Sequence, residues 1–110
     1  MSALDASLFV SSDLHKREVT LFDGSAHTFW FREFTALEYR EVQRLASSDN
    51  IADRDAHRSM LVSLCLRAED GSEVLTPERA ATLKPSVRDK LYIIALQVNV
   101  AKEEYAAASK

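Results

Sequence analysis

The sequence predicts a mainly α fold, a small domain of about four helices with a short β-hairpin near the N-terminus. Three observations support this prediction. Apolar residues recur at helical spacing through most of the chain after residue 36. The 110 residues include only two glycines and two prolines, so long uninterrupted helices are expected. Only the stretch around Asp23-Gly24 joins β-branched and aromatic residues to a tight-turn signal.

Length and composition fit one domain, residues 1–110, that is large enough to bury a core without disulfides. The net charge is −3, and basic and acidic residues are interspersed, which argues against nucleic acid as the main partner. A lone cysteine, Cys65, fits a reducing cytoplasm. The chain shows no signal peptide and no apolar run long enough to cross a bilayer. A cytoplasmic protein without a membrane partner is therefore expected.

Residues 1–14 are expected to form an N-terminal arm. Leu4, Leu8 and Phe9 could line one face of a short helix, and a frayed, flexible terminus is the alternative interpretation.

Residues 18–32 are expected to form the hairpin, with strands at 19–22 and 28–31. Asp23-Gly24 lies in the connection, and four or five residues favour a longer loop over a two-residue turn. An isolated hairpin is marginal in water, so Trp30 and its neighbours must pack on the helices or on another chain.

Residues 36–108 are expected to form the helical core, and capping signals divide its first half. Thr35 and Glu38 form a capping box that starts a helix over 36–46, which should bury Leu37, Val42 and Leu45. A second helix is expected over 51–68, capped by Asp49 or Asn50 and followed by Gly71.

The second half of the core should hold a short helix and a long one. Thr76-Pro77 starts the short helix, which should end at Leu83-Lys84 because Pro85 disfavours the α conformation before it. The final helix, over 86–108, has a wide apolar stripe and is expected to be the central element. Its stripe comprises Val87, Leu91, Tyr92, Ile94, Ala95, Leu96, Val98 and Tyr105.

No residue pattern points to catalysis, a cofactor, a metal or a small-molecule substrate. His15, His27 and His57 are not at ligand spacing, and Cys65 has no partner base, so it is interpreted as a core side chain. Two isolated glycines could not build a phosphate loop. The chain is therefore expected not to be an enzyme.

The helices at 36–46 and 51–68 have the order of a DNA-binding helix-turn-helix, so a small DNA-binding regulator is an alternative. Arg54 and Arg58 on the second helix alternate with Asp53 and Asp55, which disfavours contact with phosphates. A generic helical adaptor domain is the third interpretation.

The segment from Glu69 to Asn99, EDGSEVLTPERAATLKPSVRDKLYIIALQVN, carries a resemblance. It is similar to the C-terminal half of tail assembly chaperones from lambda-like bacteriophages, which have long non-contractile tails. The shared features are an acidic-Gly turn, a short extended link, a Thr-capped short helix and an apolar helix ending near an Asn. Upstream, only the order of elements matches: an extended segment with Arg32, a capped helix, and then a helix of about the length expected over 51–68.

This resemblance implies a non-enzymatic protein of virion morphogenesis. It would act in the host cytoplasm and be absent from the mature virion. Its partners would be the tape measure protein, whose long helices it would keep soluble, and the tail tube protein. Self-association is implied as well.

The family also implies a longer form made by ribosomal frameshifting near the C-terminus. A −1 slip needs two codons that each begin with identical bases, and no Ser codon does, so Ser109-Lys110 does not fit. Leu83-Lys84 could encode such a site, but it lies in mid-domain. A slip of another type, or none, is left open.

The N-terminal region contains more apolar material than one hairpin can bury against a small core. An exposed apolar patch commonly marks an interaction site, and here it predicts weak head-to-tail self-association. The alternative is that Trp30 belongs to the core. The candidate interaction residues are Leu4, Leu8, Phe9, Phe22, Phe29, Trp30 and Phe31.

Overall fold

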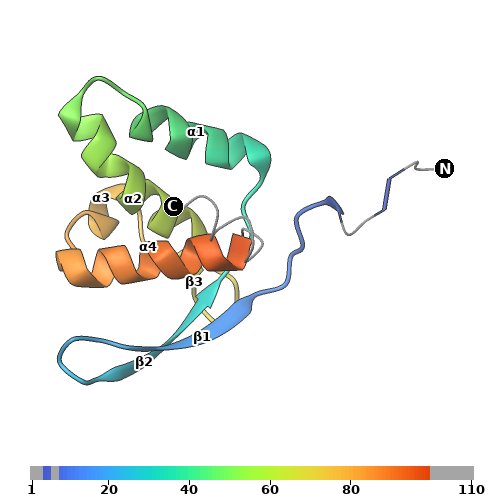
Figure 1. The fold of residues 1–110 in the computed structure, drawn as a ribbon. Helices are drawn as coiled ribbons and strands as arrows, with labels where there is room; N and C mark the ends of the chain where they lie inside the picture. The colour runs from blue at the N-terminus through green and yellow to red at the C-terminus, as the bar shows by residue number, and fades with distance from the viewer. Residues whose placement is uncertain (1–3, 6–7, 100–110) are drawn as a thin grey trace.

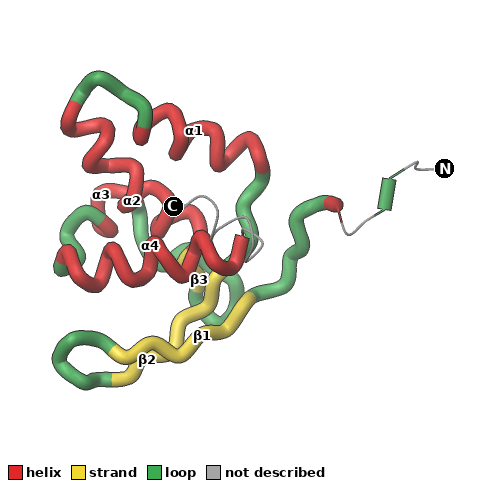
Figure 2. Tube along the Cα trace, in the orientation of Figure 1, coloured by secondary structure: helices red, strands yellow, loops and turns green. Residues whose placement is uncertain are grey.

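The computed structural model describes residues 4–5 and 8–99 (Figure 1). Its elements in chain order are β1 (His15–Thr20), β2 (Ala26–Phe31), α1 (Ala36–Ala46), α2 (Ile51–Cys65), β3 (Leu66–Arg67), α3 (Pro77–Ala80) and α4 (Pro85–Asn99). The strands form one antiparallel sheet in the order β1-β2-β3, and the helices gather beside it (Figure 2). The fold is therefore mixed α/β, and the prediction of a mainly α fold is wrong.

The third strand, β3, was not predicted, because the helix expected over 51–68 included both of its residues. The N–H of Leu66 donates to the Val62 carbonyl and closes the last turn of α2. Leu66 then adopts an extended backbone and pairs with Phe31, while Arg67 pairs with Trp30. Helix α2 consequently ends at Cys65 and not at Ala68. Pairing with a distant strand decides the conformation here, and local sequence does not reveal it.

The hairpin is confirmed, but its strands begin earlier than predicted. β1 and β2 pair from His15 opposite Phe31 to Thr20 opposite Ala26. The loop between them is therefore residues 21–25, so Leu21 and Phe22 lie in the loop and not in a strand. Gly24 has a φ of 83°, as the Asp-Gly signal predicts.

Helix α1 has the predicted bounds and the predicted capping box, and it buries Val42 and Leu45 as predicted, but Leu37 is exposed and not buried. Helix α3 is shorter than predicted: i→i+3 hydrogen bonds of Thr82 and Leu83 replace the α pattern after Ala80. Helix α4 begins at Pro85 and is described as far as Asn99. The predicted continuation to residue 108, including Tyr105, lies outside the described residues.

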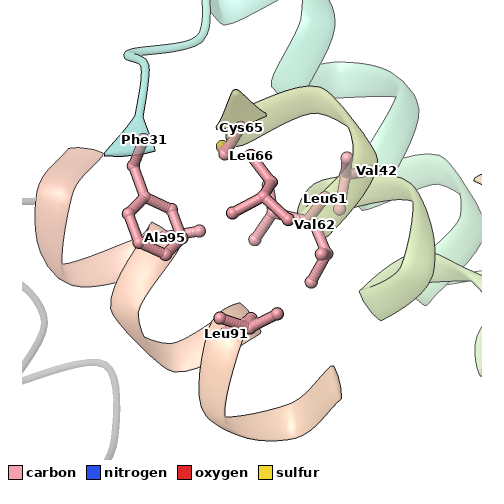
Figure 3. Close-up of a cluster of buried hydrophobic side chains, with 8 residues drawn as sticks. All are labelled: Phe31, Val42, Leu61, Val62, Cys65, Leu66, Leu91 and Ala95. Atoms are coloured by element: carbon pink, nitrogen blue, oxygen red, sulfur yellow. The ribbon is translucent and has the colours of Figure 1, made fainter. Parts of the chain in front are cut away.

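The hydrophobic core lies between α2, α4 and the inner face of the sheet (Figure 3). Helix α2 packs against α1, α3 and α4, so α2 and not the final helix is the central element. The Phe31 side chain extends from β2 toward Ala95 on α4 (Figure 3). Leu91 lies one helical turn before Ala95 on the same helix. The fully or almost fully buried members are Phe31, Val42, Leu61, Val62, Cys65, Leu66, Leu91 and Ala95.

Candidate interaction surfaces

The three consecutive aromatic residues of β2 divide between the two faces of the sheet. Successive side chains of a strand point to opposite faces, so Phe29 and Phe31 share the inner face and Trp30 points outward. Phe31 is 0% exposed, and Phe29 packs at the margin of the core. Trp30 is half-buried on the outer face, where Lys16 of β1 and Arg67 of β3 are its cross-strand neighbours. Trp30 is therefore not a member of the core cluster.

The other candidate residues lie at two separate places on the surface. Leu4, Leu8 and Phe9 are exposed, and residues 8–14 of the N-terminal arm lead away from the body of the domain (Figure 1). Phe22 is 94% exposed in the loop of the hairpin. The arm and this loop lie beyond opposite ends of β1, so the structure does not bring the candidate residues into one patch.

The end of the hairpin away from its loop is fastened by Arg32, which directly follows β2. The guanidinium donates to both carboxylate oxygens of Glu38, at 3.1 and 2.6 Å. It also donates to the carbonyls of Leu64, at 2.6 Å, and Glu33, at 3.1 Å. Arg32 thus joins the sheet to α1 and α2 through one side chain.

Glu38 is held in its ionised form at this position. The hydrogen bonds from Arg32 are the main cause that lowers the pKa of Glu38 to about 2, and the Thr35 amide at 2.9 Å adds to it. The same pair raises the pKa of Arg32. Glu38 therefore has two functions, as the capping residue of α1 and as the partner of Arg32.

Asn99, at the end of the described part of α4, fastens the same segment from the other side. Its Oδ1 accepts the Phe34 N–H at 2.8 Å. Its amide nitrogen donates to the Ala95 carbonyl at 2.9 Å and lies 3.4 Å from the carbonyl of Arg32. The link from β2 to α1 is therefore bound at Arg32 and again at Phe34.

The N-terminal arm is anchored where it enters β1. One carboxylate oxygen of Glu33 accepts the Ser11 N–H at 3.0 Å, and the other lies 3.1 Å from Nε2 of His15. The amide of Ser11 is the first cause that lowers the pKa of Glu33, and the His15 side chain is a further one. Residues 11–15 are thus held beside the end of β2.

A groove of about 600 Å³ opens beside this anchored part of the arm. Its walls come from the arm, from the residues after β2 and from the turn after β3. They are Val10, Ser11, Ser12, Leu14, Arg32, Glu33, Thr35, Arg67, Glu69, Asp70 and Gly71. This groove was not expected from the sequence, because its three walls come from separate segments of the chain, at residues 10–14, 32–35 and 67–71.

Cys65 and His57 contact other parts of the domain in ways that fit a structural role. Burial is the main cause that raises the pKa of the Cys65 thiol to about 12, so the thiolate is scarcely formed at neutral pH. The interpretation of Cys65 as a core side chain is confirmed. His57 contacts the carbonyl of Arg54 and meets the Tyr92 ring edge-on, with 5.6 Å between the ring centroids. Within residues 4–5 and 8–99, no three metal-binding side chains cluster.

A scan of protein-family models and searches of curated proteins and of solved structures each found no match to this chain. No helix among the described residues is both long enough and apolar enough to span a membrane.

The Arg32–Glu38 pair and the hydrogen bonds of Asn99 were not predicted from the sequence. One signal was available: Glu38 is the acidic member of a capping box, and Arg32 lies six residues before it across a short link. Nothing in the local sequence indicates that Asn99 returns to Phe34, since 65 residues separate the two.

Proposed function

We propose that this protein is a tail assembly chaperone of a lambda-like bacteriophage, acting without catalysis. It would bind the tape measure protein, assist assembly of the tail tube and leave before the virion matures in the host cytoplasm. The observation that carries the proposal is the similarity of residues 69–99 to such chaperones, on a chain whose sequence shows no pattern of catalytic residues.

The arrangement of the described elements supports this proposal. The described elements after residue 68 follow the order of the resemblance: the turn at Gly71, the link that pairs Glu73 with Arg67, the Thr76-capped helix and helix α4, which is described as far as Asn99. Exposed apolar side chains on the arm and the hairpin loop also suit a protein that covers the apolar stripes of a long helical client.

The DNA-binding alternative gains no comparable support. Helix α2 would be the recognition helix, but Arg58 is engaged within the domain: it pairs with Asp89 at 3.1 Å and lies over the Tyr92 ring. The core residues of α2 are also covered by the other helices. A retarded band in an electrophoretic assay, weakening steeply with added salt, would favour this alternative.

Coexpression tests the proposal directly. A long helical segment of the tape measure protein encoded downstream should remain soluble with this protein and aggregate without it. A variant with Leu4, Leu8 and Phe9 changed to serine should protect the client less than one with Ile51→Ser, an equally exposed control. A genome without tube and tape measure genes nearby, or a client unaffected by coexpression, would contradict the proposal.

A further inference from the structure

The hairpin loop presents one aromatic side chain to solvent on an ordered turn. Phe22 is 94% exposed, although burial of a phenylalanine is among the larger favourable terms available to a small domain. The Leu21 amide donates to the Ser25 carbonyl at 2.9 Å, and the Gly24 amide donates to Leu21 at 3.0 Å. Asp23 accepts from the amide of Ser25 at 2.9 Å. The turn therefore holds Phe22 outward on a fixed support.

The groove beside the arm lies at the other end of the same sheet. The loop joins β1 to β2, whereas the groove is lined by the residues that precede β1 and by those that follow β2 and β3 (Figure 1). Val10 and Leu14 supply an apolar wall, and the groove volume of about 600 Å³ exceeds what one aromatic ring requires. The molecule thus has an aromatic projection at one end and a receiving groove at the other.

Charges beside these two features are complementary. Next to Phe22 lie Asp23 and, across a small hollow, Lys84 of the segment before α4. The groove carries Arg67 of β3 and, in the turn that follows, the acidic residues Glu69 and Asp70. Within the part of the chain that the structure describes, none of these five charged side chains forms an ion pair. Asp23 can therefore meet Arg67 while Lys84 meets the acidic pair.

We infer that Phe22 of one copy inserts into the groove of a second copy of this chain. The two surfaces differ, so the contact is head-to-tail, and each added copy leaves a free Phe22 at one end and a free groove at the other. The assembly extends along the direction of the sheet. Self-association itself belongs to the proposed function; the inference adds the two surfaces that make it.

The contact is small and therefore weak. One aromatic side chain and its charged neighbours bury less than the roughly 1,200 Å² of a stable interface, so dissociation constants on the order of 0.1–1 mM are expected. Anchor residues of this kind carry much of the binding free energy, and Phe22→Ser should weaken association by at least about tenfold.

Two variants, first alone and then mixed, test the inference by sedimentation velocity from about 10 μM to about 1 mM. Phe22→Ser removes the projection, and Val10→Glu with Leu14→Glu places charge in the groove; none of these residues belongs to the core cluster. Each variant alone should remain monomeric. The mixture should form a dimer that grows no further, because one intact projection meets one intact groove. Leu37→Ser, at a residue 75% exposed on α1, is the matched control and should associate as the wild type does.

Several results would overturn the inference. The first is association of Phe22→Ser equal to that of the wild type. A second is a mixture of the two variants that stays monomeric. A third is loss of association only when Leu4, Leu8 and Phe9 are replaced, which would make the arm the occupant of the groove. A wild type that is monomeric throughout would remove self-association as well, whereas protection of a tape measure segment by Phe22→Ser would leave the chaperone function standing.

Discussion

The two ends of the hairpin differ in what they contact. At the end where β2 leaves the sheet, the Arg32 side chain binds Glu38 and two backbone carbonyls. Asn99 of α4 accepts the Phe34 amide at the same end. At the loop, the turn is ordered by its own hydrogen bonds, and Phe22 is 94% exposed. The same two strands therefore join a part of the molecule that holds the fold together to a part available to partners.

Which side chains are buried depends on the alternation of side chains between the two faces of a strand more than on how many apolar residues the strand contains. Phe31 and Trp30 are adjacent in sequence, yet Phe31 fills the core and Trp30 lies on the outer face. Substitutions at the two ends of the hairpin should accordingly affect different measurements.

The largest expected effect is on the core at the fastened end. Phe31→Ala should lower the free energy of unfolding by about 3–5 kcal/mol, since it removes a fully buried ring and leaves a cavity. Chemical denaturation followed by circular dichroism measures it. Ile93→Ala, at a residue 42% exposed on α4, should change stability by less than about 1 kcal/mol. Equal losses from both substitutions would show that the core has been assigned to the wrong residues.

Removing the guanidinium at the same end should have the next largest effect. Arg32→Met leaves Glu38 without its partner and the Leu64 carbonyl without its donor. The side chains of the pair are 22% and 30% exposed, so the loss should be about 1–3 kcal/mol, less than for a fully buried pair. Arg40→Met, an exposed substitution on α1, is the control in the same denaturation assay. Identical denaturation midpoints for the two variants would show that Arg32 does not stabilise this end of the hairpin.

The acid sensitivity of stability should follow from Glu38. Its pKa is about 2 in the folded protein against 4.5 for the ordinary group, so the unfolded chain takes up a proton first as the pH falls. The stabilisation is complete above about pH 5 and should disappear as the pH approaches about 2.

Denaturation curves at several pH values would test this dependence. Glu38→Gln should be less stable than the wild type near pH 7, and the difference should shrink toward pH 2. Glu41→Gln, which breaks an exposed pair with Arg44, should leave the pH dependence close to that of the wild type. A constant gap between wild type and Glu38→Gln would contradict the proposed cause.

The smallest effect on stability is expected at the loop. Phe22→Ser should leave the free energy of unfolding within about 0.5 kcal/mol of the wild-type value, because the ring contacts so little of its own chain. Thermal unfolding monitored by circular dichroism is sufficient to detect a larger change. A marked loss of stability would mean that Phe22 packs within its own domain.

The fold could be predicted from the sequence where signals are local. The capping box of α1, the start of α3 at Thr76-Pro77 and the left-handed Gly24 follow from neighbouring residues. β3 could not be predicted, since Leu66 and Arg67 become a strand only through Phe31 and Trp30, some 36 residues away.

The candidate site divides in the same way. The exposure of Leu4, Leu8, Phe9 and Phe22 agrees with an excess of apolar residues before residue 33. The groove and the Asn99 hydrogen bonds depend on contacts between distant segments, so no local pattern could indicate them. The tail chaperone function rests on resemblance and stays a prediction.

Amide hydrogen exchange tests most directly whether the hairpin is fastened at one end and open at the other. The Phe34 amide, bonded to Asn99, and the Gly24 amide, bonded to Leu21, are both hydrogen-bonded and differ in what surrounds them. After correction for intrinsic rates, Phe34 should exchange only through global unfolding, and Gly24 at least about 100-fold faster through local opening. Equal protection of the two amides would contradict the account.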